Sequence, residues 1–89
     1  MADEDGIRIS PDDAAHIFRA AEGHFPADTP ENRSALIAMV EDSRNFVMTD
    51  QFGSEIYASL TNDGREIWAI VRGNEIRNGG INQKPRFRK

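Results

Sequence analysis

The spacing of the apolar residues changes near Arg44, and this change divides the chain into a helical part and a stranded part. Before it, apolar side chains recur every three or four positions, as they do on one face of a helix. After it, apolar and polar residues alternate over 45–50, 55–61 and 65–72, which is typical of strands. The chain therefore predicts an α+β fold in which two N-terminal helices pack on a four-stranded antiparallel β-meander.

Two helix starts precede the strands. At 10–13 the letters SPDD place a hydroxyl residue at the N-cap, proline at the first helical position and carboxylates near the positive end of the helix dipole. We expect this helix to run to a C-cap at Gly23. Its apolar stripe would be Ala14, Ile17, Phe18 and Ala21. Thr29 begins the same start pattern again, which predicts a second helix over 30–42. One face of this second helix would carry Arg33, Leu36, Ile37 and Val40, which recur at helical spacing.

Turn-forming residues separate the strands. QFGS at 51–54 and NDG at 62–64 interrupt the alternation, and Gly73 with Asn74 fits a tight hairpin that leads into a fourth strand, EIRN. Alternation then assigns one face of the second and third strands to the helices and the other to a ligand. The face expected against the helices carries Ile56, Ala58, Leu60, Ile67, Ala69 and Val71. The face expected to meet a ligand carries Tyr57, Ser59, Thr61, Trp68, Ile70 and Arg72.

Length and composition limit the chain to one domain without disulfides. Its 89 residues suffice for one modest core, and we treat 1–89 as a single domain. The sequence has no cysteine, which excludes disulfides, thiolate chemistry and cysteine-based zinc sites. No apolar run approaches the length of a membrane span, so we expect no membrane partner. We expect 1–9 to be a flexible lead-in and 83–89 to form a basic tail.

The formal net charge of -4 hides an uneven distribution of charge. The first 31 residues carry eight acidic and two basic side chains, whereas the last 26 carry seven basic and two acidic ones. A ligand meets the local charge, so the acidic balance of the whole chain does not exclude a polyanionic partner. The basic C-terminal region is therefore the expected place for an anion.

His16 and His24 are the only histidines, and they are the side chains best suited to proton transfer near neutral pH. They stand eight residues apart across a helix end, a spacing that does not suit zinc, and no third ligand is evident. His16 lies off the apolar stripe of its helix, where an ordinary surface role is equally open. His24 follows a glycine in a loop, where it would either serve catalysis or cap the preceding helix. We expect no metal and no cofactor.

The segment NGGIN at 78–82 supports an anion site in the C-terminal region. Its two glycines would let backbone N–H groups approach a phosphate, and the amides of Asn78 and Asn82 would read polar edges. Arg72 would hold a phosphate while the indole of Trp68, on the same face, stacks on a base. The alternatives are a basic tail that frays in solvent and a tryptophan that packs beneath that tail.

Three stretches together resemble the C-terminal toxin domains of large bacterial polymorphic toxins, the contact-dependent inhibition and Rhs-type effectors. They are HIFRAAEGHFPADTPENR at 16–33, TDQFGSEIYASLTNDGREIWAIVR at 49–72 and IRNGGINQKPR at 76–86. The resemblance implies a fold similar to the barnase, EndoU, colicin and RelE-like group of small ribonucleases, in which N-terminal helices pack on a four-stranded antiparallel sheet.

The resemblance also implies a metal-independent endoribonuclease. In such enzymes the 2′-hydroxyl of the RNA attacks the adjacent phosphate and leaves a cyclic phosphate, which requires a base, an acid and groups that stabilise the phosphorane charge. The candidate catalytic residues are His16, His24, Arg19 and Arg72. The candidate RNA- or phosphate-binding residues are Thr61, Trp68, Asn78, Asn82, Lys84 and Arg86. The residues that match the family pattern and would anchor the second helix are Thr29, Asn32 and Arg33.

The same resemblance implies where the protein acts and what it meets. The domain would be secreted as the tip of a larger effector and would cut RNA, with tRNA the expected substrate, in the cytoplasm of a target bacterium. A cognate immunity protein would neutralise it by covering the basic cleft with acidic side chains. We expect a monomer when the domain is free.

Two other classes of function compete with the ribonuclease. One is a non-catalytic α+β interaction module that binds a protein or a nucleic acid. The other is an immunity protein, which the acidic pI suits but the basic C-terminus does not. Geometry separates enzyme from module, because the nuclease hypothesis places both histidines and Arg72 in one cleft, whereas the module hypothesis leaves them apart.

Overall fold

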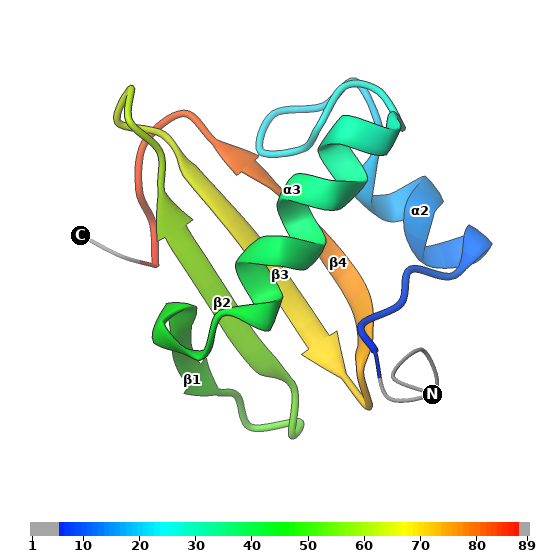
Figure 1. Cartoon of the computed structure of the whole chain (residues 1–89), viewed down its shortest axis with the longest axis vertical. Coiled ribbons are helices and arrows are strands. Elements are labelled where there is room, and N and C mark those ends of the chain that lie inside the picture. Colours follow the sequence, from blue (N-terminus) through cyan, green and yellow to red (C-terminus); the bar gives the residue numbers. More distant parts are fainter. Residues whose placement is uncertain (1–5, 88–89) are drawn as a thin grey trace.

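The computed structural model describes residues 6–87 and has two α-helices followed by a four-stranded antiparallel sheet (Figure 1). The helices are α2 (Pro11–Ile17) and α3 (Pro30–Glu41), and a short 3-10 helix, η1 (Ser43–Asn45), follows them. The strands are β1 (Phe46–Thr49), β2 (Glu55–Leu60), β3 (Glu66–Arg72) and β4 (Glu75–Asn82). They pair in chain order, β1-β2-β3-β4. The predicted α+β class, the order of helices and strands and the antiparallel meander are confirmed.

Helix α2 begins as predicted but ends early. The Ser10 side chain caps it by accepting a hydrogen bond of 3.2 Å from a backbone N–H of the first turn. The helix ends at Ile17, whereas the sequence predicted that it would run to Gly23. Phe18 is extended and forms a β-bridge with Phe25, and the two ring centroids lie 6.0 Å apart. This contact with a residue further along the chain draws the backbone out of the helix.

Helix α3 supplies the main apolar contact with the sheet. Thr29 caps it by accepting a hydrogen bond of 3.0 Å from the backbone N–H of Asn32, as the sequence predicted. The buried side chains of the helix are Leu36, Met39 and Val40. They share one core with Ile17, Phe25, Ala69, Val71 and Ile76. Complete burial of a leucine-sized side chain stabilises a fold by about 1.5–3 kcal/mol. The helix therefore fixes one face of the sheet as the core side.

The hairpin between β3 and β4 has the predicted two-residue turn. Gly73 and Asn74 both have positive φ, 60° and 64°, as a type I′ turn requires. The register of the two strands shifts between Ile70 and Val71, which leaves Arg77 as an extra residue in β4. A β-bulge of this kind bends its strand and re-aims the extra side chain. Beyond the bulge β4 continues through the GGIN segment, so it is longer than the predicted EIRN.

The register between β2 and β3 corrects the predicted faces of the sheet. Tyr57 pairs with Ala69, and Ala58 pairs with Trp68. Cross-strand partners share a face, so Tyr57 lies on the helix side and Ala58 lies on the opposite side, the reverse of the prediction. Alternation fixes which residues of one strand share a face, but not how the faces of neighbouring strands correspond. We call the side away from α3 the outer face. It carries Ile56, Ala58, Leu60, Glu66, Trp68, Ile70, Arg72, Glu75, Asn78, Gly80 and Asn82.

The described part of the lead-in to α2, residues 6–9, is paired with the sheet through Arg8. Arg8 donates its backbone N–H to the turn after β3 at 2.9 Å, and its carbonyl accepts from β4 at 2.8 Å. Ile7 and Ile9 pack against the core, which gives this segment an apolar reason to stay in place. Residues 1–5 of the predicted lead-in lie outside the described residues.

The basic tail also packs on the fold as far as it is described. The backbone N–H groups of Arg86 and Phe87 donate to the carboxylate of Glu66, at 2.9 Å and 3.1 Å. The ring of Phe87 lies against Trp68, with centroids 5.9 Å apart. These contacts hold the tail over the outer face at the start of β3. Residues 88–89 lie outside the described residues.

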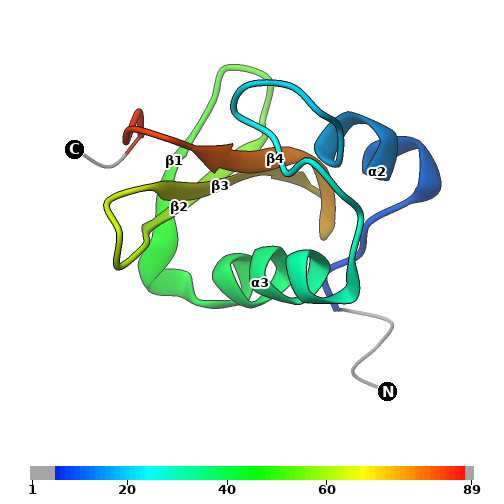
Figure 2. The ribbon, with the colours of Figure 1, turned by 90° about the horizontal axis from the view of Figure 1, so that it is seen from above.

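Helix α3 covers one face of the sheet, and the loop between α2 and α3 passes on the other side of β4 (Figure 2). The loop lies directly on the strand, because a Cβ atom added to Gly80 would stand 2.0 Å from the carbonyl oxygen of Gly23. Helix α2 packs beside β4, near the same edge of the sheet (Figure 1). The outer face is therefore flanked by α2, the loop and the tail, and this arrangement leaves room for two cavities.

Candidate functional site

Two cavities lie on the outer face, one at each end of β3. The His24 cavity has a volume of about 550 Å³ and is lined by Glu22, Gly23, His24, Trp68, Asn82, Gln83, Lys84, Pro85 and Arg86. The His16 cavity has a volume of about 680 Å³ and is lined by Asp12, Asp13, Ala15, His16, Ser54, Arg72 and Arg77. Both volumes fall within the range of small-molecule sites. The cavities share no lining residue, so the two histidines that were predicted to work together are divided between them.

His24 is held by contacts at both ring nitrogens. Its Nδ1 lies 3.1 Å from the carbonyl oxygen of Gly79, and its Nε2 lies 3.1 Å from Nη2 of Arg19. A carbonyl only accepts and a guanidinium only donates, so in this arrangement Nδ1 carries the proton and Nε2 presents its lone pair. The ring also meets Trp68 edge-on, with centroids 5.9 Å apart. His24 is therefore fixed in position, with its basic nitrogen toward Arg19.

The His24 cavity is rich in uncompensated positive charge. Lys84 and Arg86 line it, and Arg19 borders it through the contact with His24. None of these three cations has an ion pair with another residue of the described chain. Glu22 is the only carboxylate among the lining residues. An anion that enters this cavity would therefore meet cations that are available to it.

Trp68 packs beneath the tail, which corresponds to the alternative for this residue and not to the base-stacking role. It is 9% exposed, and its indole N–H donates to the carbonyl of Gly23 at 3.0 Å. Phe87 lies against the ring from the tail. Trp68 therefore forms a wall of the His24 cavity, and a base would stack on it only after the tail had moved.

Glu66 and Asn82 anchor the tail above the cavity. Glu66 is 0% exposed and accepts from Nδ2 of Asn82 at 2.9 Å, in addition to the two backbone N–H groups of the tail. A buried carboxylate is tolerated only when such donors satisfy it. Asn82, which we predicted to read RNA, therefore has its amide nitrogen committed to Glu66. The anchored tail brings Lys84 and Arg86 to the cavity.

The NGG segment has a packing role in the fold, and Asn78, Gly79 and Gly80 line neither cavity. Gly79 and Gly80 lie within β4 and pair with β3. A Cβ atom on Gly79 would stand 2.9 Å from the carbonyl oxygen of Trp68 and 3.3 Å from the side chain of Leu36. The two glycines thus let α3 and the loop approach β4 closely from opposite sides. The Oδ1 of Asn78 accepts from the N–H of Gly79 at 2.9 Å, a local contact within the strand.

Arg72 is fixed at the far end of β3, in the His16 cavity. Its Nη2 donates to the carbonyl of Phe52 and to the Oγ of Ser54, both at 3.0 Å. These bonds secure the turn between β1 and β2, while Nε and Nη1 have no hydrogen-bond partner in the described part of the chain. His16, exposed on α2, lines the same cavity. Arg72 therefore accompanies His16 and not His24, and the prediction that both histidines and Arg72 line one cleft is wrong.

Carboxylates balance the guanidiniums of the His16 cavity. Arg77, the bulge residue, pairs with Asp13 through Nε and Oδ1 at 3.3 Å. Burial raises the pKa of Asp13, but hydrogen bonds with Glu75 and Ser10 and the charge of Arg77 outweigh burial and hold the pKa below its ordinary value. Asp13 therefore stays ionised and compensates Arg77. Asp12 lines the cavity as well, so two carboxylates face two guanidiniums.

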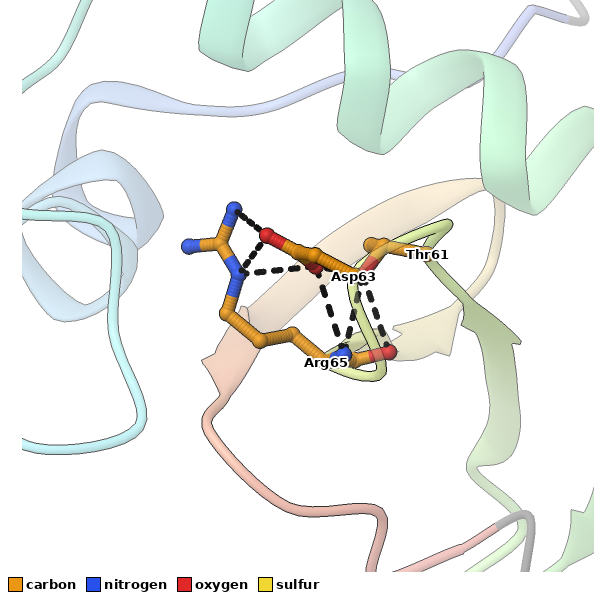
Figure 3. A network of polar contacts seen from close by, with 3 residues as sticks. All are labelled: Thr61, Asp63 and Arg65. Atoms are coloured by element: carbon orange, nitrogen blue, oxygen red, sulfur yellow. Dashed lines mark hydrogen bonds and ion pairs between the residues drawn. The ribbon is translucent and has the colours of Figure 1, made fainter.

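Thr61 lies in the turn between β2 and β3 and lines neither cavity (Figure 3). Its hydroxyl donates to Asp63 and accepts from the backbone N–H of Arg65 at 3.0 Å. Arg65 also donates to Asp63 from Nε at 3.0 Å. Hydrogen bonds from Arg65 first and Thr61 second lower the pKa of Asp63 to about 2. Thr61, predicted as an RNA contact, thus has a structural role in this turn.

Several residues of the cavities were missed by the sequence analysis. They are Glu22, Gln83, Ser54, Arg77 and the buried anchor Glu66. Glu22 and Gln83 lie inside the quoted stretches at 16–33 and 76–86, so considering every polar residue of those stretches would have found them. Ser54 and Arg77 reach their cavity through a turn and a bulge, and no local sequence pattern signals that position.

A scan of protein-family models, a search of curated proteins and a search of solved structures gave no match. Within residues 6–87, no cluster of three or more histidine, cysteine, aspartate or glutamate side chains has the arrangement of a metal site. The helices of the same part of the chain are too short and too polar to cross a membrane.

Proposed function

We propose that the chain is a metal-independent endoribonuclease domain whose chemistry takes place in the His24 cavity. The observation that carries this proposal is an oriented imidazole, His24, beside three cations that have no ion-pair partner in the described chain. Cleavage of RNA by its own 2′-hydroxyl needs a base for that hydroxyl and positive charge around the phosphate. The His24 cavity brings both together, whereas the His16 cavity pairs its histidine with balanced charges.

The proposed reaction uses the contacts of His24 directly. Arg19 turns from Nε2 toward the incoming phosphate, and Nε2 then takes the proton of the 2′-hydroxyl. The 2′-oxygen attacks phosphorus, the bond from phosphorus to the 5′-oxygen breaks, and a 2′,3′-cyclic phosphate remains. Arg19 and Arg86 stabilise the charge of the phosphorane. The leaving 5′-oxygen takes a proton from the Lys84 ammonium, which regains it from solvent.

The biological setting of the proposal comes from the motif resemblance. The domain belongs, in this proposal, to the tip of a larger secreted bacterial effector with a barnase-EndoU-colicin-RelE-like fold, and it cuts RNA, tRNA above all, in the cytoplasm of a target bacterium. A cognate immunity protein with an acidic surface neutralises it. Lys84 and Arg86 at the mouth of the His24 cavity are the charges that such a surface would match.

The direct test is incubation of the purified chain with total RNA in excess EDTA. The expected result is fragmentation of RNA with 2′,3′-cyclic phosphate ends, since the proposed chemistry needs no metal. The ends are identified by their resistance to ligation until they have been treated with a cyclic-phosphate phosphatase. RNA that stays intact at a stoichiometric amount of protein would refute the proposal.

A second candidate function is a non-catalytic module that binds RNA or a protein. The observation that favours it is the division of the two histidines between separate cavities, which leaves no histidine pair for acid-base catalysis. The same RNA experiment decides between the two candidates, because a module would retain RNA in a gel-shift assay without shortening it.

A further inference from the structure

The two cavities lie on one continuous face of β3. Trp68 in the His24 cavity and Arg72 in the His16 cavity are on the outer side of this strand, four residues apart. At the usual rise of about 3.3 Å per residue, the two positions are separated by about 13 Å. Only Ile70 stands between them on the outer side of the strand, with Asn78 as its partner on β4. Helix α3 lies on the opposite face (Figure 2), so it does not block this path.

Arg72 has N–H donors at its end of this path that make no hydrogen bond to a described residue. One nitrogen, Nη2, makes both hydrogen bonds that secure the β1–β2 turn, so Nε and Nη1 stay open to a ligand among the described residues. The turn holds the guanidinium in place, which lowers the entropy that a ligand must overcome to bind it. His16 lines the same cavity and can donate to the same ligand.

The carboxylates of the His16 cavity determine how strongly it can bind an anion. Asp13 is buried and engaged with Arg77, so this pair adds little net charge. Asp12 is exposed, and no hydrogen bond or ion pair to it is formed by the described residues, so it repels an anion that approaches Arg72. The cavity therefore suits a single weak phosphate contact, unlike the more strongly positive His24 cavity.

We propose that Arg72 binds a backbone phosphate of the same RNA strand that reacts in the His24 cavity, so that the outer face of β3 is a two-point track for single-stranded RNA. The inference rests on the proposed function for its substrate. A flexible single strand can place one phosphate at each cavity, and the nucleotides between the two phosphates would pass over the half-buried side chains of Ile70 and Asn78. Arg72 is a binding residue in this proposal and takes no part in the chemical step.

The test measures binding and does not depend on cleavage. The probe is a fluorescent single strand of about ten 2′-O-methyl ribonucleotides, which fits the usual footprint of a single-strand site and cannot undergo 2′-hydroxyl attack. Its affinity is measured by anisotropy over a range of salt concentrations for the wild type and for Arg72→Gln. Each phosphate contact to a single strand contributes about 0.7 to the slope of log K against log salt. The slope for Arg72→Gln is expected to be smaller by about this amount.

Three further variants separate charge from structure. Asp12→Asn removes the repelling carboxylate from the same cavity and is expected to tighten binding, the opposite effect to Arg72→Gln. Ser54→Ala removes a hydrogen bond that positions Arg72 but leaves its charge, so we expect a lower affinity for the probe with the salt slope retained. Arg44→Gln is the matched control. Arg44 lies in η1, pairs with Asp42 and lines neither cavity, so this variant should also keep the wild-type slope.

The outcomes distinguish this inference from the proposed function. If the wild type cuts RNA but Arg72→Gln retains the full salt slope, the track is wrong and the nuclease stands. If the wild type binds the probe with the expected Arg72 dependence but leaves RNA intact, the nuclease is wrong and the track stands as a binding surface. If Arg72→Gln and Ser54→Ala lose the same amount of salt slope, Arg72 acts only by securing the β1–β2 turn, and the inference is overturned.

Discussion

The His24 cavity and the His16 cavity contain similar residue types and differ in how their charges are paired. Each has a histidine and arginine side chains on the outer face of the sheet. In the first, the tail delivers Lys84 and Arg86, whose side chains have no ion pair with another described residue, and Glu22 is the single lining carboxylate. In the second, Arg77 is paired with Asp13, and Asp12 stands beside Arg72.

This difference shows why residue type alone is a poor guide to an anion site. A guanidinium that already binds a buried carboxylate has little attraction left for a phosphate, whereas one that extends from an anchored backbone keeps it. Within its described residues, 83–87, the tail is anchored through the backbone N–H groups of Arg86 and Phe87. Its charges are therefore fixed in place and still available.

The largest expected difference between the cavities is in catalysis. His24→Gln removes the proposed base, and we expect the rate of RNA cleavage at saturating substrate to fall by about 10²–10⁴-fold. His16→Gln changes the other cavity, and we expect less than about a tenfold loss, mainly as a higher KM, because a binding contact is weakened and no proton transfer is lost. Single-turnover rates over a range of enzyme concentrations separate the two effects. A larger loss of rate in His16→Gln would assign the chemistry to the His16 cavity.

Much of the fold could be predicted from local signals. The caps at Ser10 and Thr29 and the turn at Gly73 and Asn74 lie where the sequence predicted them, because neighbouring residues decide caps and tight turns. The helix order and the antiparallel meander followed from the change of period near Arg44. These features depend on few contacts between distant parts of the chain.

The site could not be predicted, because it depends on contacts between distant residues. Helix α2 stops at Ile17 on account of a bridge from Phe18 to Phe25, and this early end separates the two histidines. The faces of β2 depend on its register with β3, which alternation does not fix. The anchor of the tail is Glu66, a carboxylate that looks like an ordinary surface residue until the tail folds over it.

The second largest effect concerns the close contact between Gly80 in β4 and the backbone of Gly23, which lines the His24 cavity. In Gly80→Ala the new Cβ would stand 2.0 Å from the carbonyl oxygen of Gly23, and neither strand nor loop can give way cheaply. We expect the free energy of unfolding to fall by about 3 kcal/mol, at the upper end of overpacking effects. Asn78→Ala, on the same face of β4, is the control and should lose less than about 1 kcal/mol. Urea denaturation followed by Trp68 fluorescence measures both, and equal stabilities of the two variants would contradict the close contact.

A smaller effect tests whether the tail delivers the charges of the His24 cavity. Glu66→Gln replaces the carboxylate that binds Asn82 and the two tail N–H groups, and we expect a loss of about 1.5 kcal/mol in stability as charged hydrogen bonds become neutral. The released Phe87 would expose Trp68, the single tryptophan, and shift its fluorescence to longer wavelength. The shift should appear in the native protein without denaturant. Unchanged native fluorescence would mean that the tail stays in place without the carboxylate.

The smallest expected effect lies outside both cavities, in the turn that contains Asp63, and depends on pH. The folded protein holds the pKa of Asp63 at about 2, mainly through hydrogen bonds from Arg65, against an ordinary value of 3.8. The stability that this carboxylate contributes is therefore fully present above the ordinary pKa and is lost as the pH falls toward about 2. Wild type and Asp63→Asn should differ in their urea midpoint near neutral pH and converge as the pH falls from about 4 to about 2. A difference that stays constant over this range would show that the two side chains differ in packing and that the ion pair in Figure 3 adds nothing to stability.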